Sequence, residues 1–468
     1  MNDFLLFRHE VEKARREGRR WTPVVRKIYA PADPLDAYRT LLIESTRPAC
    51  ILQSAVKDGI NMYSFVCWDA PDAPVILGAN THADLALNTP APHELLPFVG
   101  GLVGYIGHEA VRHIEPTVVP HAHNPYRLPE TCFYHFGKVV VFDHATGIAY
   151  GVANAPTSLA ESSAYEVGCR AIAEMERMIL SSHAKIPADR VMGNITSNMT
   201  RDQYYTMVKR AKESIASGDV FQVVLSQRFS MPFCGLGVGL YAALRTLNPS
   251  PYMFHMRLGS ACRSAVLVGA SPEIMVSVKD SQMRIKPIAG TRRRTGDIEE
   301  DARLAQELLT DPKERAEHQM LVDLGRNDIG RQCRADSITI STLMEVEYYS
   351  HVMHIVSDIR GRLRDGVNPL DACLGALPAG TLSGAPKVRA LQLISELEAS
   401  QRGPYGGAFG WMTDHTLDTC IFIRSALLLD NTLSWQTGGG IVADSTPEGE
   451  YEETLAKANA IRAALKEL

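Results

Sequence analysis

The chain has 468 residues, of which 45% are hydrophobic and 22% are charged, and its formal net charge at pH 7 is −5. This composition is typical of a soluble globular protein with room for two or three domains, or for one large intertwined core with insertions, and it does not indicate disorder. The small negative charge provides neither the basic surface that nucleic acids require nor a polybasic membrane patch.

The sequence indicates neither a membrane segment nor a targeting segment. No apolar run approaches the roughly 18 residues that a membrane span needs, and the N-terminal stretch resembles neither a signal peptide nor a transit peptide. The nine cysteines are scattered, odd in number and without a C-x-x-C pair, which is typical of buried thiols in a reducing compartment. The sequence therefore predicts a cytoplasmic protein that acts on a small molecule or another protein.

The first part of the chain predicts short antiparallel strands. Strand-like segments separated by polar turns lie at 50–54, 63–68 and 73–77, and a hairpin is expected from 138–144 and 148–152. Residues 35–47 fit either a helix or a strand, whereas the glycine-rich stretch 98–107 predicts a tightly packed bend.

A helix is expected at 157–181, and the polar connection after it marks a domain boundary. We therefore predict an N-terminal domain at 1–190 and a C-terminal domain at 191–468. The second domain begins with a capped helix at 200–217. Its strands are expected at 220–229, 252–257, 265–269, 274–278, 283–287, 420–429 and 433–436, and its last helix from Ser445 to the end. Strands that come first, with helices grouped after them, predict an α+β fold.

The segment 311–331 predicts a helix with an unusual charge on its apolar face. Asp311 fits an N-cap, Pro312 the first helical position and Glu314 a capping box. Glu317 lies on the apolar stripe of this helix. A carboxylate there needs a cation, a hydrogen-bond donor or a raised pKa, because burying it unpaired is strongly unfavourable.

A second pair of glutamates repeats this spacing near the end of the chain. Glu450 and Glu453 are three residues apart, as Glu314 and Glu317 are, and they follow a capping-box signature at 445–448. One such pair alone is most often a solvated helix face. Two pairs on two helices predict instead a divalent-cation site, and because no His or Cys clusters with them, the cation is expected to be Mg²⁺.

Three other motifs are ambiguous or fail. The segment GTLSGAPK at 380–387 has the wrong glycine spacing for a phosphate loop. The glycine triplet at 438–440 can offer backbone N–H groups to an anion or form a plain tight turn. The arginines at 292–294 are typical of a solvated run, although they adjoin Gly290 and Thr291, whose backbone could approach a ligand.

Seven ordered blocks of the C-terminal part resemble the chorismate-utilising enzymes. They are PIAGTRRR (287–294), ERAEHQMLVDLGRNDIGR (314–331), SHVMHIVSDIRG (350–361), GTLSGAPKVRA (380–390), YGGAFGW (405–411), CIFIRSA (420–426) and QTGGGIVADSTPEGEYEET (436–454). The resemblance implies a chorismate-binding catalytic domain over the whole C-terminal part. Two further segments, LLIES (41–45) and NPSPYM (248–253), resemble the feedback site of anthranilate synthase component I.

Within this family, the resemblance implies which nucleophile reaches C2 of chorismate. Isochorismate and salicylate synthases typically carry a lysine at the position of Gln222, and aminodeoxychorismate synthase carries one at the position of Ala289. Neither lysine is present here. The resemblance therefore implies amination at C2 by ammonia and then pyruvate elimination to anthranilate. No segment resembles a glutamine amidotransferase, so the ammonia is expected to come from a separate amidotransferase subunit, within a heterotetramer, or from solution.

The resemblance also assigns the metal ligands and the catalytic groups. Mg²⁺ is expected on Glu317 and Glu453, with Glu314 and Glu450 bound to it through water. Glu273 is expected to protonate the departing C4 hydroxyl. The remaining roles fall to His354 in pyruvate elimination, to Thr381 on the substrate side, and to Gly290, Thr291, Tyr405, Arg424, Gly438, Gly439 and Gly440 as substrate-binding residues. In isolation, His354 would also fit a core histidine and Thr381 a helix N-cap.

Tryptophan is the inhibitor that the resemblance implies. Its pocket is expected to combine Glu44 and Ser45 with Pro251, Tyr252 and Met253, although both segments also fit ordinary core positions.

Other possibilities stay open at this point. A catalytically silent tryptophan-binding regulator and the aminodeoxyisochorismate and aminodeoxychorismate synthases are alternatives. The stretch GYIGHEA at 104–110 departs from the family pattern, and His108 and Glu109 have no interpretation beyond local packing.

Overall fold

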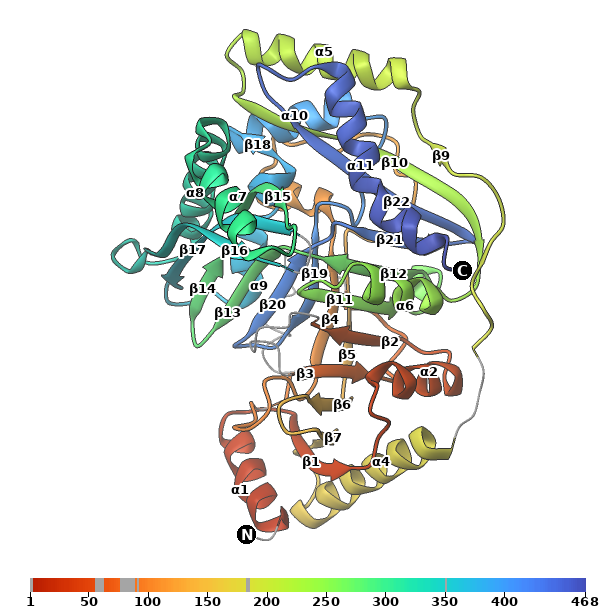
Figure 1. Cartoon of the computed structure of the whole chain (residues 1–468). Helices are drawn as coiled ribbons and strands as arrows, with labels where there is room; N and C mark the ends of the chain where they lie inside the picture. The colour runs from red at the N-terminus through yellow and green to blue at the C-terminus, as the bar shows by residue number, and fades with distance from the viewer. Residues whose placement is uncertain (1–2, 55–62, 76–88, 91, 182–185, 350–351) are drawn as a thin grey trace.

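The computed structural model describes residues 3–54, 63–75, 89–90, 92–181, 186–349 and 352–468. Within these residues the backbone forms two antiparallel sheets with helices on their outer faces, which confirms the α+β prediction (Figure 1). None of the described helices combines the length and the apolarity that a membrane-crossing segment requires.

The larger sheet has thirteen strands among the described residues. Their order is β1 (Trp21–Ile28), β7 (Ile148–Pro156), β6 (Lys138–Asp143), β3 (Tyr63–Cys67), β2 (Ala49–Gln53), β11 (Tyr252–Arg257), β12 (Val266–Ser271), β21 (Ser425–Leu429), β22 (Thr432–Ile441), β10 (Gln222–Cys234) and β18 (Gly384–Ala385). The short strands β8 (Arg190–Val191) and β9 (Thr196–Ser197) pair with β10.

The smaller sheet has nine strands in the same described part of the chain. Their order is β15 (Ile288–Arg293), β17 (Val352–Arg362), β14 (Gln282–Ile285), β13 (Ile274–Lys279), β20 (Leu417–Ile421), β19 (Ala408–Met412), β4 (Gly101–Ile106) and β5 (Thr131–Phe136), and β16 (Thr339–Tyr348) pairs with β17. The two sheets meet at an aromatic contact, where the rings of Phe254 and Phe409 stack with centroids 3.9 Å apart.

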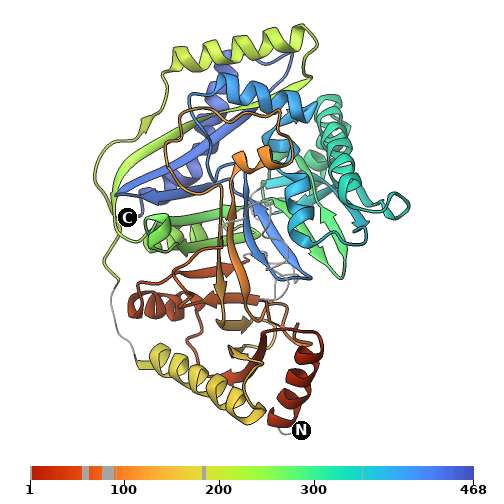
Figure 2. The ribbon, with the colours of Figure 1, turned by 180° about the vertical axis from the view of Figure 1, so that it is seen from behind.

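The helices cover both ends of this assembly (Figure 2). Helices α1 (Asp3–Arg16), α2 (Pro34–Glu44) and α4 (Glu161–Ser181) lie at the N-terminal end. The others are α5 (Arg201–Ala216), α6 (Val238–Leu247), α7 (Ile298–Thr310), α8 (Pro312–Gln332), α9 (Pro369–Ala376), α10 (Lys387–Leu397) and α11 (Pro447–Leu465), with short 3-10 turns η1 (His108–His113), η2 (Ser260–Cys262), η3 (Ala335–Ser337) and η4 (Gly380–Leu382). Helix α11 packs on β22, and α8 packs on β15 and β17.

Both sheets contain strands from both sides of the expected boundary between residues 190 and 191. In the larger sheet, β2 pairs with β11. In the smaller sheet, β4 pairs with β19. The division into domains at 1–190 and 191–468 stays a prediction, but the hydrogen-bond ladders run across it.

Helix caps were predicted well because their signals are local. Thr200 and Gln203 form a capping box at the start of α5, and the side chain of Asp311 accepts from the N–H groups of Lys313 and Glu314 at the start of α8. At α11 the N-cap is Thr446 and not Ser445. The expected hairpin and the strand at Tyr252–Arg257 are confirmed.

Several expectations differ from the structure. Residues 98–107 hold the buried strand β4 where we expected a bend. The segment 35–47, which fitted either a helix or a strand, is helical as far as Glu44, the last residue of α2. The expected strand at 73–77 is reduced to a bridge between Val75 and Phe133, and its last two residues lie outside the described part. The expected strand at 420–429 is broken between β20 and β21, where Arg424 has a φ of 48°.

Candidate active site

Glu273 lies in the turn between β12 and β13, with 8% of its surface exposed. Burial raises the pKa of this carboxyl to about 8, against the opposing effects of Thr381 and Arg424. The Oγ1 hydroxyl of Thr381 donates a hydrogen bond of 3.1 Å to Glu273 Oε1. Glu273 therefore carries a proton at neutral pH and has one of its two oxygens already engaged.

His354 projects from β17 toward a bulge in β15. Its Nδ1 lies 2.9 Å from the carbonyl oxygen of Gly290 and 3.1 Å from Thr291 Oγ1. The bulge requires a φ of 64° at Gly290, in the left-handed region that favours glycine. Because a carbonyl can only accept, Nδ1 must be the protonated nitrogen, and Nε2 keeps its lone pair. Burial lowers the pKa of His354, so the ring is neutral at pH 7.

Arg424 sits at the break between β20 and β21. Its charge acts on both Glu273 and His354, so the three side chains face one site. Burial lowers the pKa of the guanidinium, and Glu273 opposes this. Within the described residues, no side chain forms an ion pair or hydrogen bond with this guanidinium, which leaves its N–H groups for an anion.

The glycine triplet lies inside strand β22, so the tight-turn interpretation is wrong. A Cβ at Gly438 would come within 3.2 Å of the Tyr405 hydroxyl, and one at Gly440 within 2.4 Å of Gln222 Nε2. Bulkier residues would therefore fill the space above the strand.

The backbone of this triplet offers donors on one edge. Gly438 and Gly440 pair with Ser226 and Val224 of β10, whose own N–H groups donate elsewhere. These are the pairs of an antiparallel ladder that point their N–H groups away from the partner strand. On the far side the pairing of β22 with β21 ends at Trp435. The N–H groups of the two glycines therefore face the site.

The two glutamate pairs on α8 and α11 face each other. Burial raises the pKa of Glu317, and the carboxylates of Glu314 and Glu453 raise it further. Burial also raises the pKa of Glu450, helped by Glu453. Glu450 Oε1 accepts from Ser445 Oγ at 2.6 Å, whereas Oε2 is buried and has no partner within the described part of the chain.

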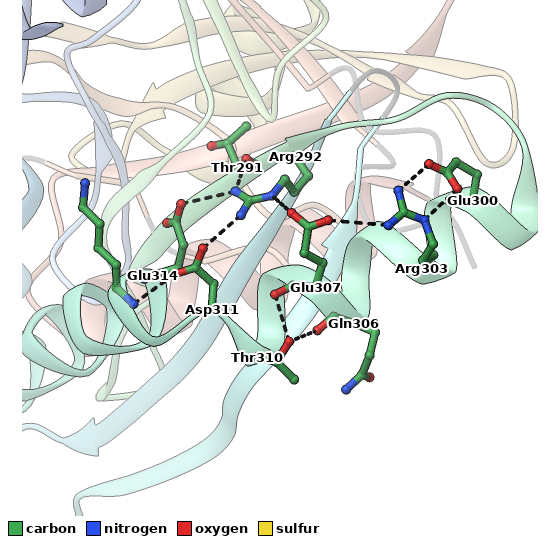
Figure 3. A network of polar contacts seen from close by, with 10 residues as sticks. Thr291, Arg292, Glu300, Arg303, Gln306, Glu307, Thr310, Asp311 and Glu314 are labelled. Carbon is green, nitrogen blue, oxygen red and sulfur yellow. Dashed lines mark hydrogen bonds and ion pairs between the residues drawn. The ribbon is translucent and has the colours of Figure 1, made fainter.

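Two basic side chains form ion pairs with one glutamate of each pair, Glu314 on α8 and Glu453 on α11. Arg292 Nη1 donates to Glu314 Oε1 at 3.3 Å, and the same guanidinium binds Asp311 and Glu307 (Figure 3). Lys457 Nζ lies 2.7 Å from Glu453 Oε1. No group of three or more His, Cys, Asp or Glu side chains in the described part of the chain is arranged to hold a metal ion. The expected closure of four carboxylates around one point is therefore not seen.

The donors nevertheless suit a hard divalent cation. All four are carboxylates. Burial and the charge of Glu453 raise the pKa values of Glu317 and Glu450, and among the described residues one buried oxygen of Glu450 has no hydrogen-bond partner. A cation bound among them would relieve each of these penalties.

Gln222 and Ala289, the two positions that the resemblance made diagnostic, lie beside Gly440 and Gly290 of the candidate site. Gln222 is buried at the start of β10, and its Oε1 has no hydrogen-bond partner among the described residues. Ala289 is buried in β15, opposite Ile355 and next to the bulge that receives His354.

The structure separates the two halves of the expected inhibitor pocket. Ser45 follows α2, and its carbonyl accepts from Arg257 at the end of β11. Pro251, Tyr252 and Met253 lie at the opposite end of that strand, about 13 Å away at 3.3 Å per residue. Glu44 is exposed. A pocket that joins Glu44 and Ser45 to this segment is therefore not present.

A different segment faces 251–253. Strand β2 runs antiparallel to β11 and pairs Gln53 with Met253. The hydroxyl of the next residue, Ser54, is buried and has no hydrogen-bond partner among the described residues. The same is true of the side-chain nitrogen of Asn248, which lies in the loop before β11. The error arose because a five-residue similarity says nothing about strand register.

Sequence reasoning missed two further site residues. Lys457 donates to the carbonyl of Gly438 at 3.0 Å as well as to Glu453, and its position four residues after Glu453 was a readable signal. The ring of Tyr349 lies edge-on to His354, with centroids 5.4 Å apart. Only the folded β16 and β17 reveal this contact.

The sequence and the fold both match known proteins. A family model described as chorismate binding enzyme matches residues 66–463. The chain belongs to the chorismate-binding enzymes. This membership agrees with a site that gathers a protonated carboxyl, a neutral imidazole and an unpaired guanidinium.

Relatives within the chorismate-binding enzymes are named anthranilate synthase component 1. That of Streptomyces coelicolor is 44% identical over 385 residues, which are 80% of this chain and 74% of the relative. The crystal structure of anthranilate synthase component I from Streptococcus pneumoniae is 32% identical, with a TM-score of 0.75, over 87% of this chain and 93% of the other. The menaquinone-specific isochorismate synthase from Escherichia coli shares the fold at 19% identity, with a TM-score of 0.73 over 98% and 99% of the two chains.

Proposed function

We propose that this protein is the synthase subunit of an anthranilate synthase. It would aminate chorismate at C2 with ammonia and then eliminate pyruvate to give anthranilate, which begins tryptophan biosynthesis. The observation that carries this proposal is the convergence of Glu273, His354 and Arg424 on one site. The names of the relatives at 40% identity and above support it.

In the first half-reaction, Glu273 is the general acid. Its carboxyl is protonated at neutral pH, and Thr381 binds one of its oxygens, so that the other oxygen can give its proton to the departing C4 hydroxyl. Ammonia attacks C2, the ring double bonds shift, and water leaves from C4. The unpaired guanidinium of Arg424 and the N–H groups of Gly438 and Gly440 bind the enolpyruvyl carboxylate, and Tyr405 borders it.

In the second half-reaction, His354 is the base. Its neutral ring has the Nε2 lone pair available, because Nδ1–H donates to the Gly290 carbonyl. Removal of the proton from C2 expels pyruvate and makes the ring aromatic. Thr291, which contacts the same imidazole, keeps the ring in this orientation.

Mg²⁺ is the proposed cofactor. Glu317 and Glu453 would hold it, with Glu314 and Glu450 in support, since their donor chemistry suits a hard cation. When bound, it supplies positive charge that neutralises the ring carboxylate of chorismate.

Ammonia is the proposed nucleophile, because no lysine occupies position 222 or 289. A glutamine amidotransferase subunit would supply the ammonia within a heterotetramer. A cytoplasmic location is proposed from the free cysteines, most of which are buried thiols.

Feedback inhibition by tryptophan is also proposed, at a corrected place. The pocket would lie where Pro251, Tyr252 and Met253 face Gln53 and Ser54 across β2 and β11. The partnerless hydroxyl of Ser54 and amide of Asn248 would receive the polar end of the amino acid.

An assay with chorismate, ammonium salts and Mg²⁺ tests the proposal. Fluorescence of anthranilate, together with release of pyruvate, is the expected result. An aminated product that retains the enolpyruvyl group would indicate an aminodeoxyisochorismate or aminodeoxychorismate synthase. Unchanged chorismate would indicate a silent regulator and would overturn the proposal. Glutamine in place of ammonium should give no product unless an amidotransferase subunit is added.

A further inference from the structure

Arg402 is a buried cation beneath the candidate site. Its side chain is only 1% exposed, and the side chain of its partner Glu398 is only 4% exposed. The two form a bidentate pair, with Nη2 at 2.6 Å from Oε1 and Nε at 3.0 Å from Oε2. A buried charge of this kind must be well compensated, because desolvation alone is strongly unfavourable.

The remaining donors of Arg402 bind segments that carry expected substrate-binding residues. Nη1 donates to the carbonyl of Leu382, the residue after Thr381, at 2.7 Å. Nη2 donates to the carbonyl of Val224 in β10 at 2.8 Å. The guanidinium also lies over the ring of Tyr405, 5.6 Å from its centroid. One side chain thus contacts three walls of the site.

Glu398 extends these contacts to the glycine strand. Its Oε1 accepts from the N–H of Ser226 at 2.9 Å and from Ser226 Oγ at 2.7 Å. Gln436 Nε2 in turn donates to Ser226 Oγ at 2.7 Å. Gln436 lies two residues before Gly438 in β22. The ion pair is therefore connected to the strand whose N–H groups face the site.

Glu109 fixes the backbone at the other side of Arg402. Its two oxygens accept from the N–H groups of Arg402 at 2.7 Å and Gly403 at 3.0 Å. Burial acts to raise the pKa of Glu109, but His108 and the N–H of Arg402 outweigh it and keep the pKa below its ordinary value. The ionised Glu109 holds the turn that leads to Tyr405. The stretch 104–110 thus has a defined task.

We propose that Arg402, paired with Glu398, is a positioning residue that sets the relative placement of Thr381, Tyr405 and the glycine strand. The proposal rests on the proposed function, because it assigns these walls to chorismate. A purely structural ion pair would behave differently, since replacing both of its members by apolar residues is often neutral for stability and would leave substrate binding unchanged.

The double variant Arg402→Met with Glu398→Leu tests this directly. It removes both charges together, so neither is left buried alone. The matched control is Arg19→Met with Asp414→Leu, a second buried pair with side chains 6% and 9% exposed that lies outside the site. Circular dichroism and thermal unfolding report folding, calorimetry reports chorismate binding in the presence of Mg²⁺, and anthranilate formation reports KM and kcat.

The expected result is a folded double variant whose chorismate Kd and KM rise about tenfold or more, since small displacements of binding groups have large effects, while the control variant keeps native values. A folded double variant with native Kd and KM would overturn the proposal. If the double variant does not fold, the single variant Arg402→Lys, with Glu398 intact, tests the positioning role instead. Lysine keeps the charge, but its ammonium has three donors and no planar fork, whereas Arg402 makes four hydrogen bonds to Glu398, Leu382 and Val224. The same rise is therefore expected, and a native KM would overturn the proposal.

The experiments distinguish failure of the proposed function from failure of the positioning role of Arg402. If the native protein binds chorismate but forms no anthranilate, the proposed function fails and the calorimetric comparison still tests Arg402. If native protein makes anthranilate and the folded variants match it, only the positioning role fails. A native protein that does not bind chorismate would overturn both.

Discussion

The hydroxyl of Tyr252 donates a hydrogen bond of 2.9 Å to Asp418 Oδ1, and this bond joins the larger sheet to the smaller one. Tyr252 begins β11, whereas Asp418 lies in β20. The N–H of Ile421, at the end of β20, donates to the carbonyl of Glu273 at 3.0 Å. The proposed inhibitor segment is thus connected to the strand that supports Glu273, the proposed general acid.

We expect Tyr252→Phe to lower the free energy of unfolding by about 1–2 kcal/mol, because it leaves a buried carboxyl without its donor. Burial raises the pKa of Asp418, and the Tyr252 hydroxyl opposes this. A carboxyl whose folded pKa exceeds its unfolded value destabilises the fold increasingly as pH rises above about 4. Removing the hydroxyl raises that pKa further, so the deficit should be larger at pH 8 than at pH 5. Urea unfolding of this variant and of Tyr29→Phe, at an exposed position, checks this. An equal deficit at both pH values would contradict it.

Replacing Thr381 by Val should move the alkaline limb of the kcat/KM profile to higher pH. The acid must be protonated to act, and the pKa of Glu273 is about 8. The Thr381 hydroxyl lowers that pKa because it stabilises the carboxylate, so its loss raises the limb by about one pH unit. Thr381→Ser keeps the hydroxyl and should leave the limb in place. A limb that stays still in Thr381→Val would remove Glu273 from the acid role.

Glu317→Gln and Glu453→Gln should each reduce Mg²⁺-dependent anthranilate formation by more than about 100-fold, since each loses a charged ligand without losing volume. The fold should persist by circular dichroism. Glu448→Gln, at an exposed position on the same helix as Glu453 with 73% of the side chain exposed, should retain activity. Chelation of Mg²⁺ should abolish the native activity reversibly. Near-normal turnover in either of the first two variants would exclude that residue as a direct ligand.

His354→Asn should slow pyruvate elimination more than amination. The new amide can still donate to the Gly290 carbonyl, but it supplies no base where Nε2 was. We therefore expect an aminated intermediate that retains the enolpyruvyl group to accumulate, as judged by mass spectrometry of quenched reactions. A fall in anthranilate without any intermediate would assign His354 to the first half-reaction or to binding.

Tryptophan inhibition should respond to Ser54 and not to Ser45. Ser54→Phe places a ring beside Tyr252 and should fill the pocket, so that inhibition is relieved while the uninhibited rate is kept. Ser45 lies beside Arg257, at the other end of β11, so the Ser45→Phe variant should still be inhibited by tryptophan. Coupling of about 1–3 kcal/mol between tryptophan and chorismate is expected in the native protein, and it is reciprocal. If calorimetry shows that Ser45→Phe weakens tryptophan binding and Ser54→Phe does not, the pocket would lie at Ser45, as first expected from the sequence.

The caps of α5 and α8 and the strand at Tyr252–Arg257 were predictable because their signals lie within a few residues. The pairing of β22 with β10 was not, because its partners are two hundred or more residues apart in the chain. For that reason the glycine triplet was open to two interpretations until its strand was seen.

The sequence indicated which carboxylates belong to the candidate metal site, but it did not indicate how their side chains are arranged. The spacing of Glu314 and Glu317, and of Glu450 and Glu453, singled out carboxylates whose charges act on their neighbours in the folded chain. Nothing local indicated that Arg292 would hold Glu314 or that Lys457 would hold Glu453. The buried contacts of Arg402 were equally hidden, since they join its segment to three others, at Glu109, Val224 and Leu382.

Each sheet pairs strands that precede residue 190 with strands that follow residue 191, and this limits how the chain can be divided. Cutting it there would strip β2 from β11 and β4 from β19, and each fragment would present unpaired strand edges to solvent. Such fragments would associate with one another, or with copies of themselves, before either formed a stable core. The polypeptide can therefore be split only as a pair of complementing fragments, and its N-terminal part cannot be exchanged as an independent module.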